Sequence, residues 1–305
     1  MTFDDLDIAI FSYNRAAYLQ NCVMSVQRHC PGARLTIFDD ASTDPDTLAY
    51  LASLPEGMVV QPGSQDAAGR HGGLYYNMQR ALDRADRTLL LTLQDDTQVV
   101  RSLDQSDWDT ILSAFETDPQ RAFLSVLFIK SVRETRYKRL LRPVPEQSLY
   151  DLRNDLSPQN HAKRMAYFDI SLMHVDRLHA AHWQMQNSEA ANVEQARRLF
   201  APMPTMAHPF VFFCPEVPFF RNRGQSLAAK LALRVVGRDV KTLKDMTPAQ
   251  IKAMKTRDMS TYPVAETFLE ADNPKVRKPF VYKDVKARWW LSALHKIEQA
   301  LKGRR

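Results

Sequence analysis

The chain has 305 residues, 45% of them hydrophobic and 25% charged; this composition excludes a disordered or fibrous protein, and no apolar run approaches the ~20 residues that cross a bilayer. It begins Met-Thr-Phe-Asp-Asp-Leu-Asp, without the basic and apolar segments of a signal peptide, so we expect a cytoplasmic protein or one peripheral at the inner face of the membrane. The net charge of +6 is concentrated in residues 226–305, which hold 18 basic and 8 acidic residues, and this favours an anionic partner surface such as a membrane or a nucleic acid.

The first hundred residues alternate apolar segments of strand length with segments of helical periodicity. The run at 88–93 has no polar alternation, which is typical of a strand buried on both faces of a parallel sheet. The alternation predicts a doubly wound α/β fold with right-handed crossovers. Strands are expected at 7–13, 34–38, 58–60 and 88–93, and helices at 16–29, 45–54 and 74–85.

Two adjacent carboxylates, Asp95 and Asp96, directly follow the last of these strands. Parallel sheets bind ligands just beyond the carboxyl ends of their strands. Hard carboxylate oxygens suit Mg²⁺ or Mn²⁺, and such a metal would hold a substrate that bears phosphate. The second strand also ends in two acids, Asp39 and Asp40, which could either accept hydrogen bonds from a nucleotide base or cap the next helix.

A nicotinamide-binding fold would show the same alternation of strand and helix. That fold needs a glycine-rich turn directly after its first strand, because the backbone must approach a pyrophosphate. The turn here is Ser12-Tyr13-Asn14-Arg15-Ala16 and contains no glycine. We therefore exclude dinucleotide binding of that kind.

Beyond residue 100 we expect a helix at 104–117, an irregular basic loop at 130–164, and strands at 122–129, 165–171 and 208–215. The cysteines have neither paired nor metal-binding spacing, which predicts free buried thiols; they are Cys22, Cys30 and Cys214. Two basic amphipathic helices are expected at 227–236 and 289–301. The apolar stripe of the second helix could lie on an anionic membrane or pack back on the domain; it consists of Trp289, Trp290, Leu294, Ile297 and Leu301.

Four segments in the first third of the chain together resemble the family 2 glycosyltransferases of the GT-A fold. They are Ile10 to Arg15, Asp39-Asp40-Ala41-Ser42-Thr43-Asp44, Arg70 with Gly73 and Asn77, and Gln94-Asp95-Asp96. The resemblance implies a Rossmann-like, mostly parallel sheet flanked by helices. It implies a GT-A domain at 1–226, with a nucleotide-sugar-binding half at 1–100 and an acceptor half at 101–226, followed by a basic helical C-terminal extension at 227–305.

The resemblance also implies roles for individual residues. Asp96 would bind Mn²⁺ or Mg²⁺ and Asp95 would meet the ribose. The other nucleotide contacts would come from Ser12, Tyr13, Arg15, Asp39, Asp40, Arg70 and Gly73. The family usually places a catalytic Asp where this chain has Gln195, which cannot accept a proton. Glu194 or Glu189 is therefore expected to act as the base, although each of these polar residues could instead cap an element or lie in solvent.

We thus expect a metal-dependent, inverting glycosyltransferase that moves a sugar from a nucleotide diphosphate, with UDP favoured, to a hydroxyl group. The acceptor would be a glycan or lipid-linked glycan in polysaccharide or glycoconjugate synthesis, and no nucleic acid is expected. Two alternatives stay open. A nucleotidyltransferase on a related fold would usually carry a glycine-rich basic loop after its first strand. A catalytically silent relative would bind nucleotide sugar or a membrane partner.

Overall fold

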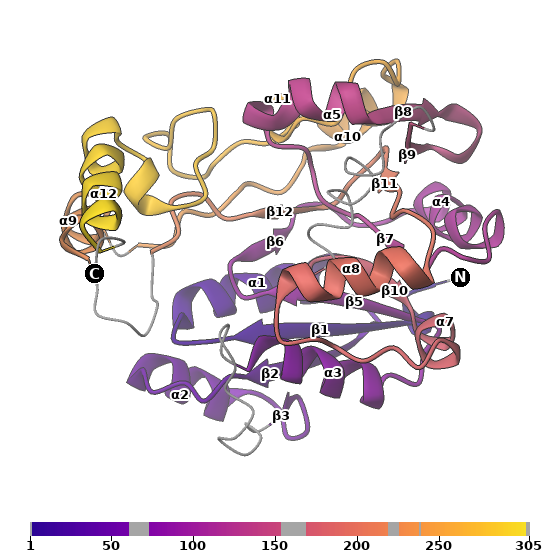
Figure 1. Ribbon diagram of the computed structural model, residues 1–305, viewed down its shortest axis with the longest axis horizontal. Helices are drawn as coiled ribbons and strands as arrows, with labels where there is room; N and C mark the ends of the chain where they lie inside the picture. Colours follow the sequence, from indigo (N-terminus) through magenta and orange to yellow (C-terminus); the bar gives the residue numbers. More distant parts are fainter. Residues whose placement is uncertain (1, 61–72, 154–168, 219–225, 238, 303–305) are drawn as a thin grey trace.

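The computed structural model describes residues 2–60, 73–153, 169–218, 226–237 and 239–302. Its largest sheet has the strand order β3-β2-β1-β5-β10-β7 (Figure 1). The first four strands run parallel, and β10 runs antiparallel to both of its neighbours. Their bounds are β3 (Val59–Val60), β2 (Arg34–Asp39), β1 (Leu6–Ser12), β5 (Leu89–Gln94), β10 (Leu172–His174) and β7 (Phe123–Leu124). The predicted mixed α/β fold with a mainly parallel sheet is confirmed.

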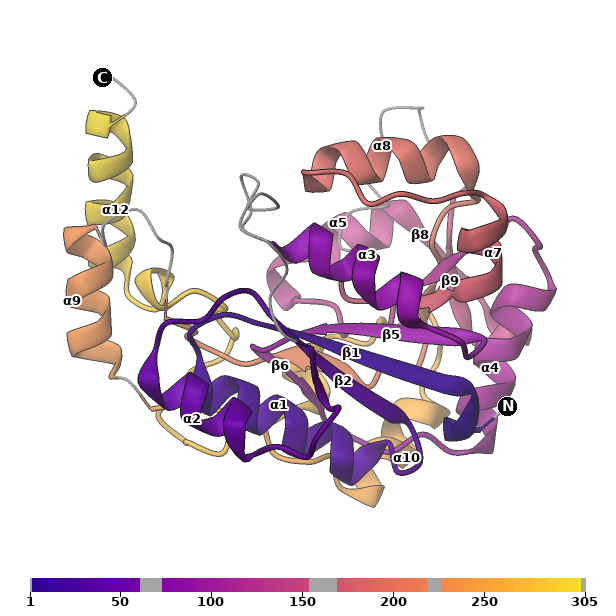
Figure 2. The ribbon, with the colours of Figure 1, turned by 90° about the horizontal axis from the view of Figure 1, so that it is seen from below.

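Both faces of this sheet are buried, as the apolar run at 88–93 predicts. In β5, Leu91 and Leu93 pack into one hydrophobic core, whereas Leu90 packs into a second core on the opposite face. The alternation follows from the two-residue period of a strand. Figure 2 shows the helices α1 and α2 on one side of the sheet and α3, α7 and α8 on the other. Their bounds are α1 (Ala16–His29), α2 (Pro45–Ser53), α3 (Leu74–Arg84), α7 (Val175–Ala180) and α8 (Glu189–Leu199).

Three expectations for the middle of the chain are wrong. The strand expected at 122–129 shortens to β7, because the residues after it pair singly with different segments: Ser125 with Thr205, Leu127 with Val211 and Ile129 with Val264. The strand expected at 208–215 shortens to β12 (Val211–Phe213), which pairs with β6 (Thr97–Val99). The described part of the basic loop is ordered rather than irregular, with α5 (Glu134–Leu140), β8 (Leu141–Val144) and β9 (Leu149–Leu152), and a second small sheet joins β8 and β9 to β11 (Thr205–Met206).

Of the strand expected at 165–171, residues 169–171 are not in a strand, and the pairing with Leu89–Leu91 of β5 instead forms β10 at Leu172–His174. Residues 165–168 lie outside the described residues. The predicted helix at 104–117 is α4 (Gln105–Glu116), which Asp104 caps by accepting a hydrogen bond from the backbone of Asp107. The three cysteines are free and buried, as expected.

The C-terminal residues form α9 (Leu227–Val236), α10 (Pro248–Thr256), α11 (Ala265–Phe268) and α12 (Trp289–Lys302). The segment between α9 and α12 returns to the main body, where Leu243, Met254 and Phe280 join the core that contains Leu91. Within the described residues no helix is both long and apolar enough to span a membrane.

Candidate functional site

Three of the predicted motifs meet at the carboxyl edge of the main sheet. The register pairs Ser12 of β1 with Asp39 of β2, and Phe11 with Gln94 of β5. Backbone hydrogen bonds continue past the ends of the strands, since the Asp95 N–H donates to the carbonyl of Phe11 at 3.0 Å. The turns after β1, β2 and β5 therefore lie side by side, although Tyr13 and Asp95, which form a hydrogen bond, are 82 positions apart.

The turn after β1 is shaped by Asn14, which has a φ of +53°. Asparagine tolerates this left-handed conformation better than most residues. Its side-chain oxygen accepts hydrogen bonds from the backbone N–H groups of Thr43 at 2.7 Å and Asp44 at 2.9 Å. Asn14 thus ties the first turn to the second, and it leaves Arg15 free to extend toward the third.

Asp95 and Asp96 form a buried acidic pair that Arg15 bridges. Arg15 Nη1 lies 2.9 Å from Asp95 Oδ1 and also contacts Asp96 Oδ2. The Tyr13 N–H donates to Asp95 Oδ2 at 3.1 Å. Asp95 is 3% exposed and Asp96 is fully buried. Such burial is tolerated because the guanidinium compensates the carboxylate charges. Sequence reasoning placed these three residues at one site but not this ion pair.

A tyrosine from the C-terminal segment also contacts the acidic pair. The Tyr282 hydroxyl donates to Asp96 Oδ2 at 2.5 Å. Lys130 lies close by, with its Nζ 4.0 Å from the ring centre of Phe213 and 5.1 Å from that of Tyr282. Neither Tyr282 nor Lys130 follows a recognisable motif, so the sequence gives no signal that would have found them.

Three side chains at this site have perturbed pKa values: Asp95, Lys130 and Tyr282. Burial raises the pKa of Asp95 to about 7, against the opposing effect of Arg15. Burial, followed by the charge of Arg133, lowers the pKa of Lys130 to about 8. Desolvation and the charge of Asp96 raise the pKa of Tyr282 well above its ordinary range. Perturbations of this kind are typical of functional sites.

A divalent cation is compatible with the acidic pair. The described part of the chain holds no cluster of three or more His, Cys, Asp or Glu side chains suited to a metal. Mg²⁺ and Mn²⁺ need only one or two carboxylates when substrate phosphates supply further ligands. Asp96 Oδ1 is buried and has no hydrogen-bond donor among the described residues. A hard oxygen acceptor without a partner fits that coordination, so Asp96 is the residue that would hold the ion.

The two acids at the end of β2, Asp39 and Asp40, make contacts that hold local structure. Asp39 accepts from the Ser42 backbone N–H at 2.8 Å and from its hydroxyl at 2.6 Å. Asp40 accepts twice from the Gly73 N–H, at 2.7 and 2.8 Å. A Cβ atom at Gly73 would lie 2.1 Å from Asp40 Oδ1, so a larger residue here would force the Asp40 carboxylate to move. The nucleotide contacts expected of Asp39, Asp40 and Gly73 stay predictions.

The nucleotide contacts expected of Ser12 and Arg70 also stay predictions. Ser12 is 2% exposed and its hydroxyl has no hydrogen-bond partner in the described ranges, so it has capacity for a ligand. Arg70 falls in the segment 61–72, outside the described residues.

Asp169 lies at the same edge of the sheet, beside the end of β5. Because β10 is antiparallel to β5, the residues before β10 lie beside the carboxyl end of β5, and the Thr92 N–H donates to the Ser171 carbonyl at 3.0 Å. Asp169 Oδ2 accepts from the Tyr75 hydroxyl at 3.4 Å, whereas Oδ1 is buried without a partner among the residues that the structure describes. Burial, and then the charge of Glu189, raises the pKa of Asp169 to about 7.

The structure places the two predicted bases differently. Glu189 is the first residue of α8, is partly buried, and interacts electrostatically with Asp169. Glu194 is exposed and forms an ion pair with Arg197 on the same helix at 2.5 Å. Sequence reasoning missed Asp169 because it placed this residue inside a strand expected at 165–171, whereas in the structure Asp169 precedes β10.

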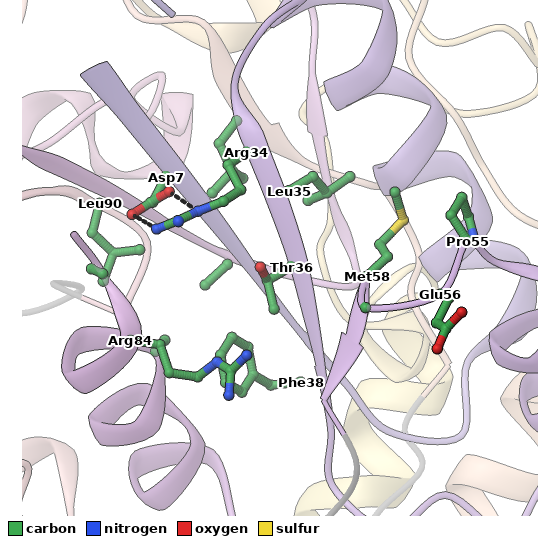
Figure 3. A pocket seen from close by; sticks show the side chains of 15 residues that line it. Asp7, Arg34, Leu35, Thr36, Phe38, Pro55, Glu56, Met58, Arg84 and Leu90 are labelled. Atoms are coloured by element: carbon green, nitrogen blue, oxygen red, sulfur yellow. Dashed lines mark hydrogen bonds and ion pairs between the residues drawn. The ribbon is translucent and has the colours of Figure 1, made fainter. Parts of the chain in front are cut away.

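A cavity of about 440 Å³ lies away from this edge, toward the amino ends of β1 and β2 (Figure 3). None of the predicted site residues lines it. Two acidic side chains line it: Asp7 is bound by Arg34 through two 2.7 Å hydrogen bonds, and Glu56 is exposed. Because the cavity contains none of the predicted site residues, the carboxyl edge remains the candidate site.

No protein-family model matches the chain, and no curated protein does. Among solved structures, S. aureus TarS 1-349 is similar over 83% of this chain and 70% of its own, with 13% identity and a TM-score of 0.46. Its complex with UDP covers 83% and 69%, again with 13% identity and a TM-score of 0.46. The mannosyltransferase PcManGT from Pyrobaculum calidifontis, in complex with GDP-Man and Mn²⁺, covers 97% and 75% with 13% identity and a TM-score of 0.42. At this identity the likenesses concern the course of the chain and not its chemistry.

Proposed function

We propose that this protein is a glycosyltransferase that uses a nucleotide-diphosphate sugar, with UDP favoured as the nucleotide. The observation that carries the proposal is the meeting of Asp95, Asp96 and Arg15 at the carboxyl edge of the sheet, in the sequence context that resembles family 2 glycosyltransferases. A parallel sheet binds ligands at this edge. A buried acidic pair with a basic side chain beside it suits the polar end of such a donor.

In this mechanism Asp95 orients the ribose, and the diphosphate lies beside Asp96, Arg15 and Lys130. The acceptor oxygen attacks the anomeric carbon while the bond to the diphosphate oxygen breaks on the opposite side, so the configuration inverts. The charge that develops on the diphosphate is stabilised by the two cationic side chains. When bound at Asp96, Mn²⁺ or Mg²⁺ would supply further positive charge there.

For the base that takes the acceptor proton, the geometry favours Asp169, with Glu189 as its electrostatic neighbour. Its pKa of about 7 suits a general base at neutral pH, since the ideal catalytic pKa lies near the working pH. Glu194 is less suited, because it is exposed and already paired with Arg197. The acceptor is a hydroxyl group of a glycan or lipid-linked glycan.

The proposal is tested by incubating the protein with UDP- and GDP-sugars in the presence of Mn²⁺, and measuring release of the nucleoside diphosphate and the anomeric configuration of the sugar. We expect slow hydrolysis of one donor with inversion. Tight binding of a donor without turnover would instead support the catalytically silent relative. Formation of a nucleotide sugar from a sugar phosphate would support the nucleotidyltransferase.

A further inference from the structure

Exposed apolar side chains are concentrated on the two helices α9 and α12. Eleven large hydrophobic side chains are exposed in the described chain, and six of them lie on these helices: Leu227, Val235, Trp289, Trp290, Ile297 and Leu301. Trp289 is 83% exposed and Leu301 is 63% exposed. Single exposed apolar residues are ordinary on a protein surface, but a contiguous set indicates an interaction site.

The two helices pack against each other through side chains other than the exposed ones. Leu291 of α12 is fully buried against Ala229 and Ala232 of α9. Glu298 accepts hydrogen bonds from the backbone N–H groups of Leu227 at 2.7 Å and Ala228 at 3.0 Å, and so caps α9. Figures 1 and 2 both show the pair standing at one end of the molecule. The contact between the helices therefore leaves the apolar side chains uncovered.

The uncovered side chains share one side of α12. At 3.6 residues per turn, Trp289, Ile297, Trp290 and Leu301 fall within an arc of about 120°, and Leu291 lies outside it. On α9, Leu227 and Val235 are eight residues apart, which places them on the same side of that helix. Each helix thus has one apolar face for its partner and a second that no described residue covers.

The charges around these faces are basic. The exposed charged side chains of the two helices and of the segment just before α12 are Lys230, Arg234, Lys286, Arg288 and Lys296. The same ranges contain two acidic residues. Asp284 is buried, and Glu298 caps α9. An apolar face with tryptophan at its edge and lysine or arginine around it complements a bilayer that carries anionic headgroups.

We propose that α9 and α12 form a docking surface for an anionic lipid bilayer, in which Trp289, Ile297 and Leu301 enter the headgroup region and the basic side chains contact lipid phosphates. Tryptophan prefers this interface because its ring is amphipathic. The inference is independent of the proposed glycosyltransferase activity, since it rests on the exposed faces of two helices and their charge.

The experiment is co-sedimentation of the full chain with vesicles of phosphatidylcholine alone or mixed with phosphatidylglycerol. We expect binding to the mixed vesicles that is at least tenfold tighter than to phosphatidylcholine. Trp289→Ser combined with Ile297→Ser should weaken this binding at least tenfold, and Lys230→Glu combined with Lys296→Glu should do the same. Val132→Ser is the matched control, because Val132 is 72% exposed but lies outside the two helices, and it should bind as the wild type does.

All of these side chains are exposed, so an unchanged melting temperature will show that the variants are folded. Equal binding by the Trp289→Ser, Ile297→Ser variant would overturn the proposal, as would absence of binding to the mixed vesicles. Light scattering would detect a second possibility. If the wild type forms a dimer and does not bind vesicles, while the Trp289→Ser, Ile297→Ser variant is monomeric, the exposed face binds a second copy of the chain and the bilayer proposal is refuted.

Discussion

Replacing Asp169 by asparagine should make the protein more stable and less active. Asp169 has its pKa raised from 3.8 to about 7, so the folded state holds its proton over a range where the unfolded state has lost it. The contribution of this carboxyl group to the free energy of unfolding is fully present below pH 3.8. It is lost as the pH rises to 7, because the buried carboxyl group then ionises in the folded state. At roughly 1.4 kcal/mol per pKa unit, full ionisation costs about 4 kcal/mol.

The amide introduced by Asp169→Asn carries no charge and keeps an oxygen to accept from Tyr75, so the variant escapes this cost. An unpartnered N–H would offset it by about 1–3 kcal/mol, but that offset does not vary with pH. The difference in unfolding free energy between Asp169→Asn and wild type should therefore grow in favour of the variant between pH 4 and pH 7 and stay constant above. Urea unfolding at several pH values measures it.

The same substitution should lower turnover by about 10²–10⁴-fold, since that is what a general base contributes, with donor affinity unchanged. Wild-type turnover should rise about tenfold per pH unit below pH 7 and level off above it. Glu194→Gln is the matched control and should change turnover by only a few-fold. If Asp169→Asn keeps its activity while Glu194→Gln loses it, Glu194 is the base and Asp169 is not catalytic. A stability difference that does not vary with pH would refute the charge argument itself.

Three more substitutions test the rest of the site. Asp96→Ala should abolish metal-dependent donor binding in calorimetric titrations of Mn²⁺ and UDP, and wild-type-like metal dependence would refute the assignment of this carboxylate. Tyr282→Phe removes one hydrogen bond to a charged group, an effect of about 1.5–3 kcal/mol, so kcat/KM should fall by roughly 10–100-fold; an unchanged kcat/KM would mean that Tyr282 only packs. Gly73→Ala should destabilise the fold by about 1–3 kcal/mol in urea unfolding, because its Cβ meets Asp40, and Asp40→Ala in the same chain should restore part of the loss if that clash is the cause.

The local patterns of the sequence predicted most of the parallel half of the fold. The helix at 16–29 and the burial of β5 on both faces follow from periodicity, and Pro45 after Asp44 marks the start of α2. The strands in the middle of the chain were harder to predict. Residues 125–129 pair with segments 80 to 135 positions away, and nothing in their own composition distinguishes single bridges from a continuous strand.

The site residues likewise divide into those that local sequence patterns predict and those that depend on long-range contacts. Asp95 and Asp96 could be placed at the edge because they end a strand, and Arg15 because it follows one. Asp169, Lys130 and Tyr282 could not, because their roles depend on the antiparallel insertion of β10 and on the return of the C-terminal segment to the core. No short-range rule encodes contacts of that kind.

The hydrogen bond from Tyr282 to Asp96 joins residues 186 positions apart, and it has a consequence for biosynthesis. The N-terminal strands can pair as soon as they leave the ribosome, since domains fold from the N-terminus during synthesis. The segment 281–284 can dock on the backbone of Glu216 and Val217 only after these strands have been synthesised and residue 284 has emerged. Until then Asp96 lacks the hydroxyl donor of Tyr282, so during synthesis the sheet that supports the candidate site can form before the site itself is complete.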